Sequence, residues 1–152
     1  MARYFPEASA GVQLHYRLYY DQWWEPEPDP WGMLAHSVEG RLYVDVTRDL
    51  EVRVAYRFHT QGAALFADCS LNPAAAPSPD CNVPFDTGDE KLAALNTHFT
   101  ELKLTWEARG LATVPVLAWF AAGAFELSYG RYLQTTHYGS AHLLQSGYSI
   151  PF

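Results

Sequence analysis

Alternation of apolar and polar side chains over long stretches is the feature that most constrains how this chain folds. In residues 11–22, every second position from Val12 to Tyr20 is apolar, and the positions between them are mainly polar. The same pattern recurs in residues 36–46, 50–60 and 98–108. Because successive side chains of a β-strand point to opposite faces of a sheet, this period of two predicts strands with one apolar and one polar face.

Two further stretches, residues 116–133 and 140–152, complete a set of six predicted strands. We expect an all-β fold, in which an antiparallel meander of about six long strands forms part of a transmembrane β-barrel. Residues 1–152 then make up a single barrel domain or barrel segment. Residues 116–124 are apolar on both predicted faces. Either a neighbouring segment packs against their inner face, or this stretch is a short helix.

The polar face favours a membrane barrel over a soluble sandwich. In a membrane barrel the apolar face meets lipid and charged side chains line the lumen, whereas a sandwich buries its apolar face. The predicted strands of about 11–17 residues exceed the usual 5–6, and a tilted membrane strand needs about 9–11. The predicted lumen-facing charges are Arg17, Glu39, Arg41, Arg53, Arg57, Glu101 and Lys103.

The connections between the predicted strands alternate in length. Residues 47–49 and 109–115 form short links, whereas long outer loops are expected at about residues 22–33 and 67–97. Short periplasmic turns and long outer loops are typical of outer-membrane barrels. Tryptophans near strand ends also favour this class, because aromatic girdles mark the two membrane boundaries. The tryptophans are Trp23, Trp24, Trp31, Trp106 and Trp119.

The second and third predicted strands fix their own register, because directly opposed residues share a face. With Val46 and Leu50 both on the apolar face, the turn holds residues 47–49. Counting back pairs Val44 with Val52, Leu42 with Val54, Gly40 with Tyr56, and Glu39 with Arg57. The Gly40 pair resembles aromatic rescue, in which a ring covers a strand glycine. The Glu39 pair predicts an ion pair on the lumen wall.

Three segments resemble the C-terminal part of an uncharacterised family of bacterial outer-membrane proteins, a domain of unknown function. The likeness covers residues 3–68 and rests on an R-Y-x-P start, a Y-R-x-Y-Y-D core and the stretch Y-R-F-H-T-Q-G-A-A. The ending with Tyr148, Ile150 and Phe152 is similar to the C-terminal insertion signal of outer-membrane barrels. The resemblance implies a bacterial outer-membrane location. It also implies contacts with the lipid bilayer, lipopolysaccharide and the outer-membrane assembly machinery.

Six strands are fewer than the eight of the smallest single-chain barrels, and members of that family are longer. We therefore expect a fragment of a longer barrel or an assembly subunit. Its edge strands would pair with other barrel strands or subunits. The first residues lack the apolar core of a signal peptide, so an exported form would be mature or trimmed.

The expected loop at residues 67–97 carries the only two cysteines, Cys69 and Cys81. In an exported protein, two cysteines in one loop predict a disulfide. Both long loops are also rich in Asp and Glu. These carboxylates form either a solvated acidic surface or a site where divalent cations bridge them to lipopolysaccharide phosphates.

Charge and motif content argue against several functions. The net charge of −7 offers no basic surface for nucleic acid. No apolar run has the length of a transmembrane helix. His15 and His59 share the polar face without a third metal ligand, and no catalytic or phosphate-loop motif occurs. We expect no catalytic, cofactor-binding or metal-binding residues.

These expectations combine into a non-enzymatic outer-membrane β-barrel protein or barrel segment that acts as a pore, scaffold or membrane anchor. Two alternatives stay open. A soluble lipocalin-like barrel would turn the apolar face inward around a small ligand. A membrane-barrel enzyme such as a lipid hydrolase would need a nucleophile and a base that the sequence does not identify.

Overall fold

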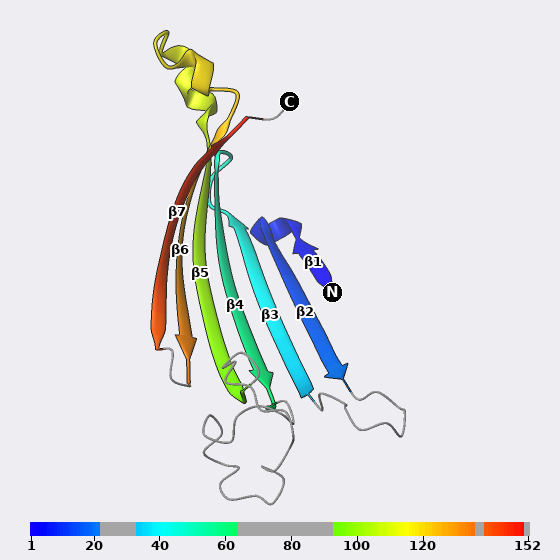
Figure 1. Ribbon diagram of the computed structural model, residues 1–152. Coiled ribbons are helices and arrows are strands. Elements are labelled where there is room, and N and C mark those ends of the chain that lie inside the picture. Colours follow the sequence, from blue (N-terminus) through cyan, green and yellow to red (C-terminus); the bar gives the residue numbers. More distant parts are fainter. Residues whose placement is uncertain (22–32, 64–92, 136–138, 151–152) are drawn as a thin grey trace, which may run out of the picture.

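A computed structural model describes residues 1–21, 33–63, 93–135 and 139–150. Seven antiparallel strands form one sheet in which the spatial order follows the sequence (Figure 1). The prediction of an all-β antiparallel meander is confirmed. The strands are β1 (Ala2–Phe5), β2 (Ala10–Asp21), β3 (Met33–Asp45), β4 (Leu50–Gln61), β5 (Leu95–Glu107), β6 (Ala124–Gln134) and β7 (Ser140–Ser149).

Within the described ranges, three short 3-10 helices lie between strands: η1 (Pro6–Ala8), η5 (Ala108–Thr113) and η6 (Ala118–Phe120). The last two rise above the sheet at the end where β5 and β6 are joined (Figure 1). Within the residues that the structure describes, no helix is long and apolar enough to cross a membrane.

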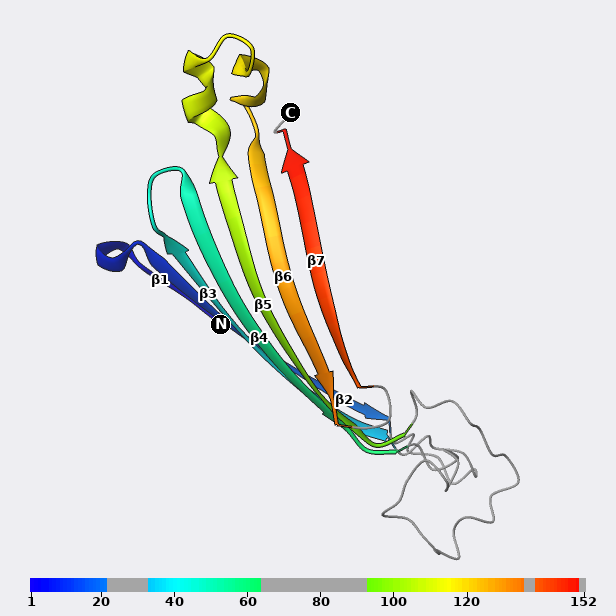
Figure 2. The ribbon, with the colours of Figure 1, turned by 90° about the vertical axis from the view of Figure 1, so that its left-hand side faces the viewer.

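The sheet is curved and twisted, and it stays open. The view turned by 90° shows the strands fanning apart toward the β3–β4 turn and η5–η6, and converging toward the opposite end (Figure 2). The edge strands of the described sheet are β1 and β7, and these two strands do not pair with each other. The short strand β1 covers part of the β2 edge, where Leu14 N donates to Met1 O at 2.8 Å.

The predicted register of the β3–β4 hairpin is confirmed at every pair. Val44 lies opposite Val52, Leu42 opposite Val54, Gly40 opposite Tyr56, and Glu39 opposite Arg57. Val46 N donates to Leu50 O at 2.9 Å, so residues 47–49 form the turn as expected. The alternation alone therefore specified which side chains face each other in this hairpin.

Two side-chain predictions within that hairpin are wrong. A Cβ atom on Gly40 would meet nothing within 4 Å, so the Tyr56 ring does not cover it. Tyr56 Oη is instead hydrogen-bonded to His98 Nδ1 at 2.8 Å. Glu39 does not pair with Arg57, because it accepts a hydrogen bond from Arg41 Nε on its own strand at 2.5 Å.

The predicted fifth strand starts too early, and the alternative of a short helix is the correct one there. Residues 116–123 contain η6 and turns, and β6 begins only at Ala124. The connection between β5 and β6 is therefore residues 108–123, much longer than the expected short link. The four-residue strand β1 was not predicted either.

The described part of the chain has no large side chain that is fully buried. Its buried residues are Ala35, Ala55, Ala93, Thr97, Ala108, Gly123 and Gly130, all small. A soluble domain of this size buries large apolar residues in a core. This sheet therefore leaves its apolar side chains to be covered by something outside the described residues.

Candidate functional site

The two faces of the sheet differ in chemistry and in exposure. All seven predicted lumen-facing charges lie on one face, because they occupy alternate positions that are paired in register. On the other face lie large apolar side chains such as Leu14, 50% exposed, and Leu127, 47% exposed. The side chains of Glu101 and Lys103 on the charged face are only 19% and 21% exposed.

This difference identifies the charged face as the inner side of the curve. Side chains converge on the concave face of a curved sheet and diverge on its convex face, which leaves the convex ones more exposed. We call the charged face the inner face and the apolar face the outer face. The arrangement is the reverse of a soluble half-barrel, which would put its apolar side chains on the concave side.

Ion pairs run diagonally across β4, β5 and β6 on the inner face. Arg53 Nη2 donates to Glu101 Oε1 at 2.9 Å, and Lys103 Nζ lies 2.7 Å from Glu126 Oε2. Arg53 lies directly opposite Lys103, so these cations share one row of the sheet. Two like charges in one row repel each other, and the carboxylates of Glu101 and Glu126 beside them offset this repulsion. Glu126, which completes the second pair, was not among the predicted site residues.

Arg53 Nε is buried and has no hydrogen-bond partner within the described structure. Beside it, Arg53, Glu101, Lys103, Glu126 and Gln145 line a hollow of about 590 Å³ between β4 and β7. A buried guanidinium N–H normally finds an acceptor, so this position suits a water molecule in a hydrated space.

A ring on the inner face covers a glycine that the sequence did not single out. The Arg57 guanidinium lies 5.5 Å from the centroid of the Phe99 ring. A Cβ atom on Gly130 would lie 2.9 Å from Phe99 Cε2. Phe99 therefore occupies the space above Gly130, as predicted for Tyr56 above Gly40.

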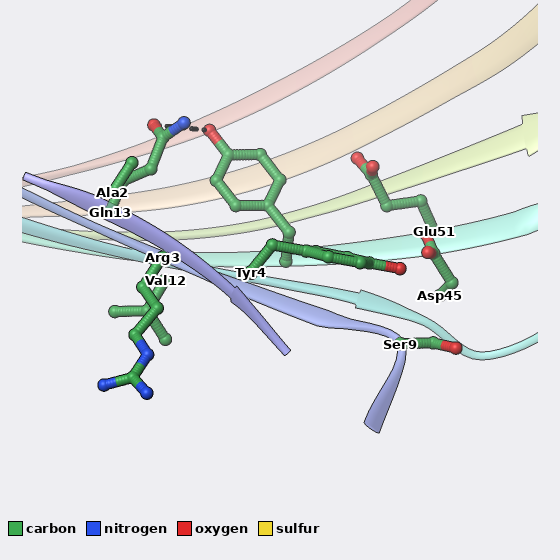
Figure 3. Close-up of a pocket in the computed structure, with 10 residues that line it drawn as sticks. Ala2, Arg3, Tyr4, Ser9, Val12, Gln13, Asp45 and Glu51 are labelled. Carbon is green, nitrogen blue, oxygen red and sulfur yellow. Dashed lines mark hydrogen bonds between the residues drawn. The ribbon is translucent and has the colours of Figure 1, made fainter. Parts of the chain in front are cut away.

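The polar character of the inner face continues to the first edge of the sheet (Figure 3). Tyr43 Oη donates to Gln13 Oε1 at 3.3 Å, and Glu51 projects to the same side as Gln13. These residues border a hollow of about 530 Å³. Arg3 points to the opposite side, where its guanidinium lies 5.0 Å from the Phe5 ring centroid.

At the η5–η6 end, the outer face carries a cluster of aromatic rings. Trp106 stacks on Phe125 with ring centroids 5.8 Å apart, and Phe125 lies 4.7 Å from Tyr148. Tyr148 Oη donates to Phe120 O at 2.8 Å, which ties the end of β7 to η6. Tyr148 was predicted from the C-terminal pattern, and this contact with η6 was not.

At the other end of the outer face, three tyrosines are hydrogen-bonded to histidines on neighbouring strands. The Oη to Nδ1 distances are 2.7 Å for Tyr16–His36, 2.8 Å for Tyr56–His98 and 2.6 Å for Tyr129–His142. The sequence analysis missed all three pairs. Their signal is a diagonal offset between strands, which becomes visible only once the register of every hairpin is known.

One histidine of the inner face is engaged in a hydrogen bond. His59 Nδ1 is hydrogen-bonded to Ser37 Oγ at 2.8 Å. No group of three or more His, Cys, Asp or Glu side chains suited to a metal occurs in the four described ranges.

Several predicted features lie outside the described residues. These are Cys69, Cys81, Phe152, Trp23, Trp24, Trp31 and all the acidic residues of the two predicted loops. Ile150, the middle residue of the predicted insertion signal, is described and is 46% exposed.

No protein-family model, curated protein or solved structure matches this chain.

Proposed function

We propose that this chain is part of an outer-membrane β-barrel and acts, without enzymatic activity, as a pore, scaffold or membrane anchor. Its outer face would contact lipid acyl chains, and its inner face would line a hydrated lumen. In this proposal the protein resides in the bacterial outer membrane. Its partners are the bilayer, lipopolysaccharide, the assembly machinery and further barrel strands.

The observation that carries the proposal is the exposure of the apolar face. Val12, Leu14, Leu42, Val54 and Leu102 are all more than 40% exposed and lie on adjacent strands of one face. Soluble monomers rarely expose a contiguous apolar patch larger than a few hundred Å². A lipid bilayer removes such a surface from water over its whole height, which supports a membrane-spanning sheet.

The distribution of charge supports the same orientation. Among the described strand residues, the outer face carries only two charged side chains, Arg3 on the short strand β1 and Arg131, three residues before the end of β6. The inner face carries the ion pairs. A charge on the lipid side of a barrel at mid-bilayer costs about 2–4 kcal/mol, whereas lumen positions tolerate charge.

A soluble lipocalin-like barrel fits these observations less well. Such a barrel would need its apolar side chains on the concave side, around the ligand. Here the less exposed, concave side is lined by Arg53, Glu101 and Lys103. An apolar ligand would meet charges there, and the apolar outer face would meet water.

The proposal also requires further strands at the open edges. Inside hydrocarbon, an unpaired backbone N–H or C=O costs several kcal/mol, so membrane sheets close. The free edge of β7 and the part of β2 beyond β1 would each leave a row of such groups. We propose that strands from another chain, or from another part of the same protein, complete the barrel.

Purification with and without detergent tests the proposed function. We expect the protein to be β-rich by circular dichroism and monodisperse only in detergent or lipid. A folded, monodisperse preparation in buffer alone would contradict the proposal. Stabilisation of such a preparation by an added small apolar ligand would favour the lipocalin-like alternative.

A further inference from the structure

The three tyrosine–histidine pairs repeat one geometry. Their ring centroids are 6.1, 6.2 and 5.9 Å apart, and their interplanar angles are 32°, 33° and 31°. In each pair the histidine lies two residues before the residue directly opposite the tyrosine, on the neighbouring strand. We name these six residues the Tyr–His belt.

The pairs also lie at one depth below the strand ends. Tyr16, Tyr56 and Tyr129 are each five residues before the end of their strands, at positions 21, 61 and 134. His36 and His98 are three residues after the start of theirs, and His142 is two residues after the start of β7. The ends of β2 to β6 on that side lie near one level (Figure 1). The belt therefore stays at one distance from the strand ends, and in register each pair is displaced by two residues from the pair before, since Tyr16 shares a row with Val38, Phe58 and His98.

The belt lies near one end of the strands only, the loop end. Its pairs join β2 to β3, β4 to β5 and β6 to β7, the strands that are connected at the loop end. The aromatic cluster with Trp106 marks the other end.

The belt and the aromatic cluster define a height. Trp106 is eight residues after His98 on β5. At about 3.3 Å per residue and a strand tilt of about 35–45°, this spacing gives a height of roughly 20 Å. This is close to the apolar band of about 25 Å in outer-membrane barrels.

Each pair holds two donor hydrogens, one on the imidazole and one on the tyrosine hydroxyl, and the hydrogen bond within the pair uses one of them. When the tyrosine hydroxyl donates to Nδ1, the neutral imidazole carries its proton on Nε2, where it can donate to another group. Aromatic side chains that only pack at the boundary of a membrane need no hydrogen bond between tyrosine and histidine, yet this pair occurs three times. The belt supplies three donors at one distance from the strand ends on the outer face.

The charge at this level favours an anionic acceptor. Arg131 lies directly opposite His142 on the outer face. Among the described strand residues, no carboxylate occupies that face. Phosphate groups accept strongly from N–H donors and from arginine.

We propose that the Tyr–His belt, with Arg131, binds the phosphate groups of lipopolysaccharide at the loop-side boundary of the membrane. The inference rests on the proposed function, together with an orientation in which the long loops face outward. The belt thereby fixes the depth of the sheet in the bilayer. Lipopolysaccharide is chosen over phospholipid because long loops of outer-membrane barrels face outward.

Chemical modification of the wild-type protein tests this without any substitution. Diethylpyrocarbonate acylates accessible imidazoles, and mass spectrometry reports each histidine separately. In detergent, we expect added lipopolysaccharide to slow the modification of His36, His98 and His142 and to leave His15 and His59, on the inner face, unchanged. No protection of the three histidines would overturn the proposal, and equal protection by phosphatidylglycerol would overturn the choice of lipopolysaccharide.

Substitution tests the donors themselves. The triple variant H36F/H98F/H142F keeps three aromatic rings and removes three N–H donors, and H59F on the inner face is the matched control. We expect the triple variant to bind lipopolysaccharide roughly ten- to a thousandfold more weakly, as the loss of three ordinary hydrogen bonds would. The control should bind like wild type, and unchanged binding by the triple variant would overturn the belt.

The two proposals fail differently. A protein that still needs detergent but shows no lipopolysaccharide protection contradicts the belt alone. A wild-type protein that is monodisperse without detergent contradicts both the membrane proposal and the belt.

Discussion

Val54 on β4 lies directly opposite Leu102 on β5, and both side chains are almost half exposed, 47% and 44%. Their sequence neighbours Arg53 and Glu101 form an ion pair on the other face, where their side chains are 23% and 19% exposed. The apolar pair is thus the more exposed one. A bilayer around the sheet would cover the apolar pair and leave the ion pair in the lumen.

Placing a cation on the outer face should destabilise the protein in lipid. Val54→Arg puts the charge near the middle of the apolar band, and we expect a loss of about 2–4 kcal/mol in the free energy of unfolding. Thr105→Arg is the control, because Thr105 lies on the inner face between Glu51 and Glu126 in register. Urea unfolding in phospholipid vesicles measures both. Equal losses for the two variants would contradict the assignment of the faces.

Two glycine substitutions should have opposite effects. Gly130→Ala drives a methyl group against the Phe99 ring, and we expect a destabilisation of about 1–3 kcal/mol from overpacking. Gly40→Ala meets nothing within 4 Å and should stabilise by about 0.5–1 kcal/mol, since glycine is unfavourable inside a strand. Thermal unfolding in detergent compares them. If Gly40→Ala destabilised the protein as much as Gly130→Ala, the Phe99 ring would not explain the effect at Gly130.

The sequence predicted the parts of the fold that depend on alternation. A one-residue slip in the β3–β4 hairpin would place valines beside charged residues, so the pairing of Val44 with Val52 followed from the pattern. Residues 116–123 could not be assigned in this way, because apolar residues on both sides fit a strand and a helical turn equally. Strand β1 has only four residues, too few for a period of two to stand out.

Side-chain partners were harder to predict than register. The Gly40–Tyr56 pairing was correct, yet the Tyr56 hydroxyl reaches diagonally to His98 and the ring leaves Gly40 uncovered. Glu39 likewise has two arginines within reach, Arg57 across the hairpin and Arg41 on its own strand, and it bonds Arg41. Register fixes which backbone positions are opposed, while long polar side chains choose among several neighbours.

The Cys69–Cys81 disulfide stays a prediction, since both residues lie outside the described ranges. We expect alkylation without reductant to modify neither thiol. Reduction should leave the circular dichroism of the sheet unchanged, because the seven described strands are paired through residues outside 69–81. Mass spectrometry that finds both cysteines alkylated without reductant would remove the disulfide from the account.

The free edge of β7 should be paired in the assembled protein. Along an edge strand, the amides that point away from β6 have no partner in this sheet and would exchange quickly. If further strands complete the barrel, hydrogen exchange in detergent should show slow exchange for both sets of β7 amides. Fast exchange of alternate amides along residues 141–148, in an otherwise folded sample, would argue against closure.

The most direct test of the lipid-facing assignment is the environment of single side chains in a bilayer. Leu102 and Thr105 lie on opposite faces of β5, and each can be replaced by a spin-labelled cysteine in a background with Cys69→Ser and Cys81→Ser. In phospholipid vesicles, we expect the label at 102 to collide mainly with oxygen, which concentrates in hydrocarbon. The label at 105 should collide mainly with a water-soluble nickel complex. The opposite accessibilities, with 102 in water and 105 in hydrocarbon, would contradict the account.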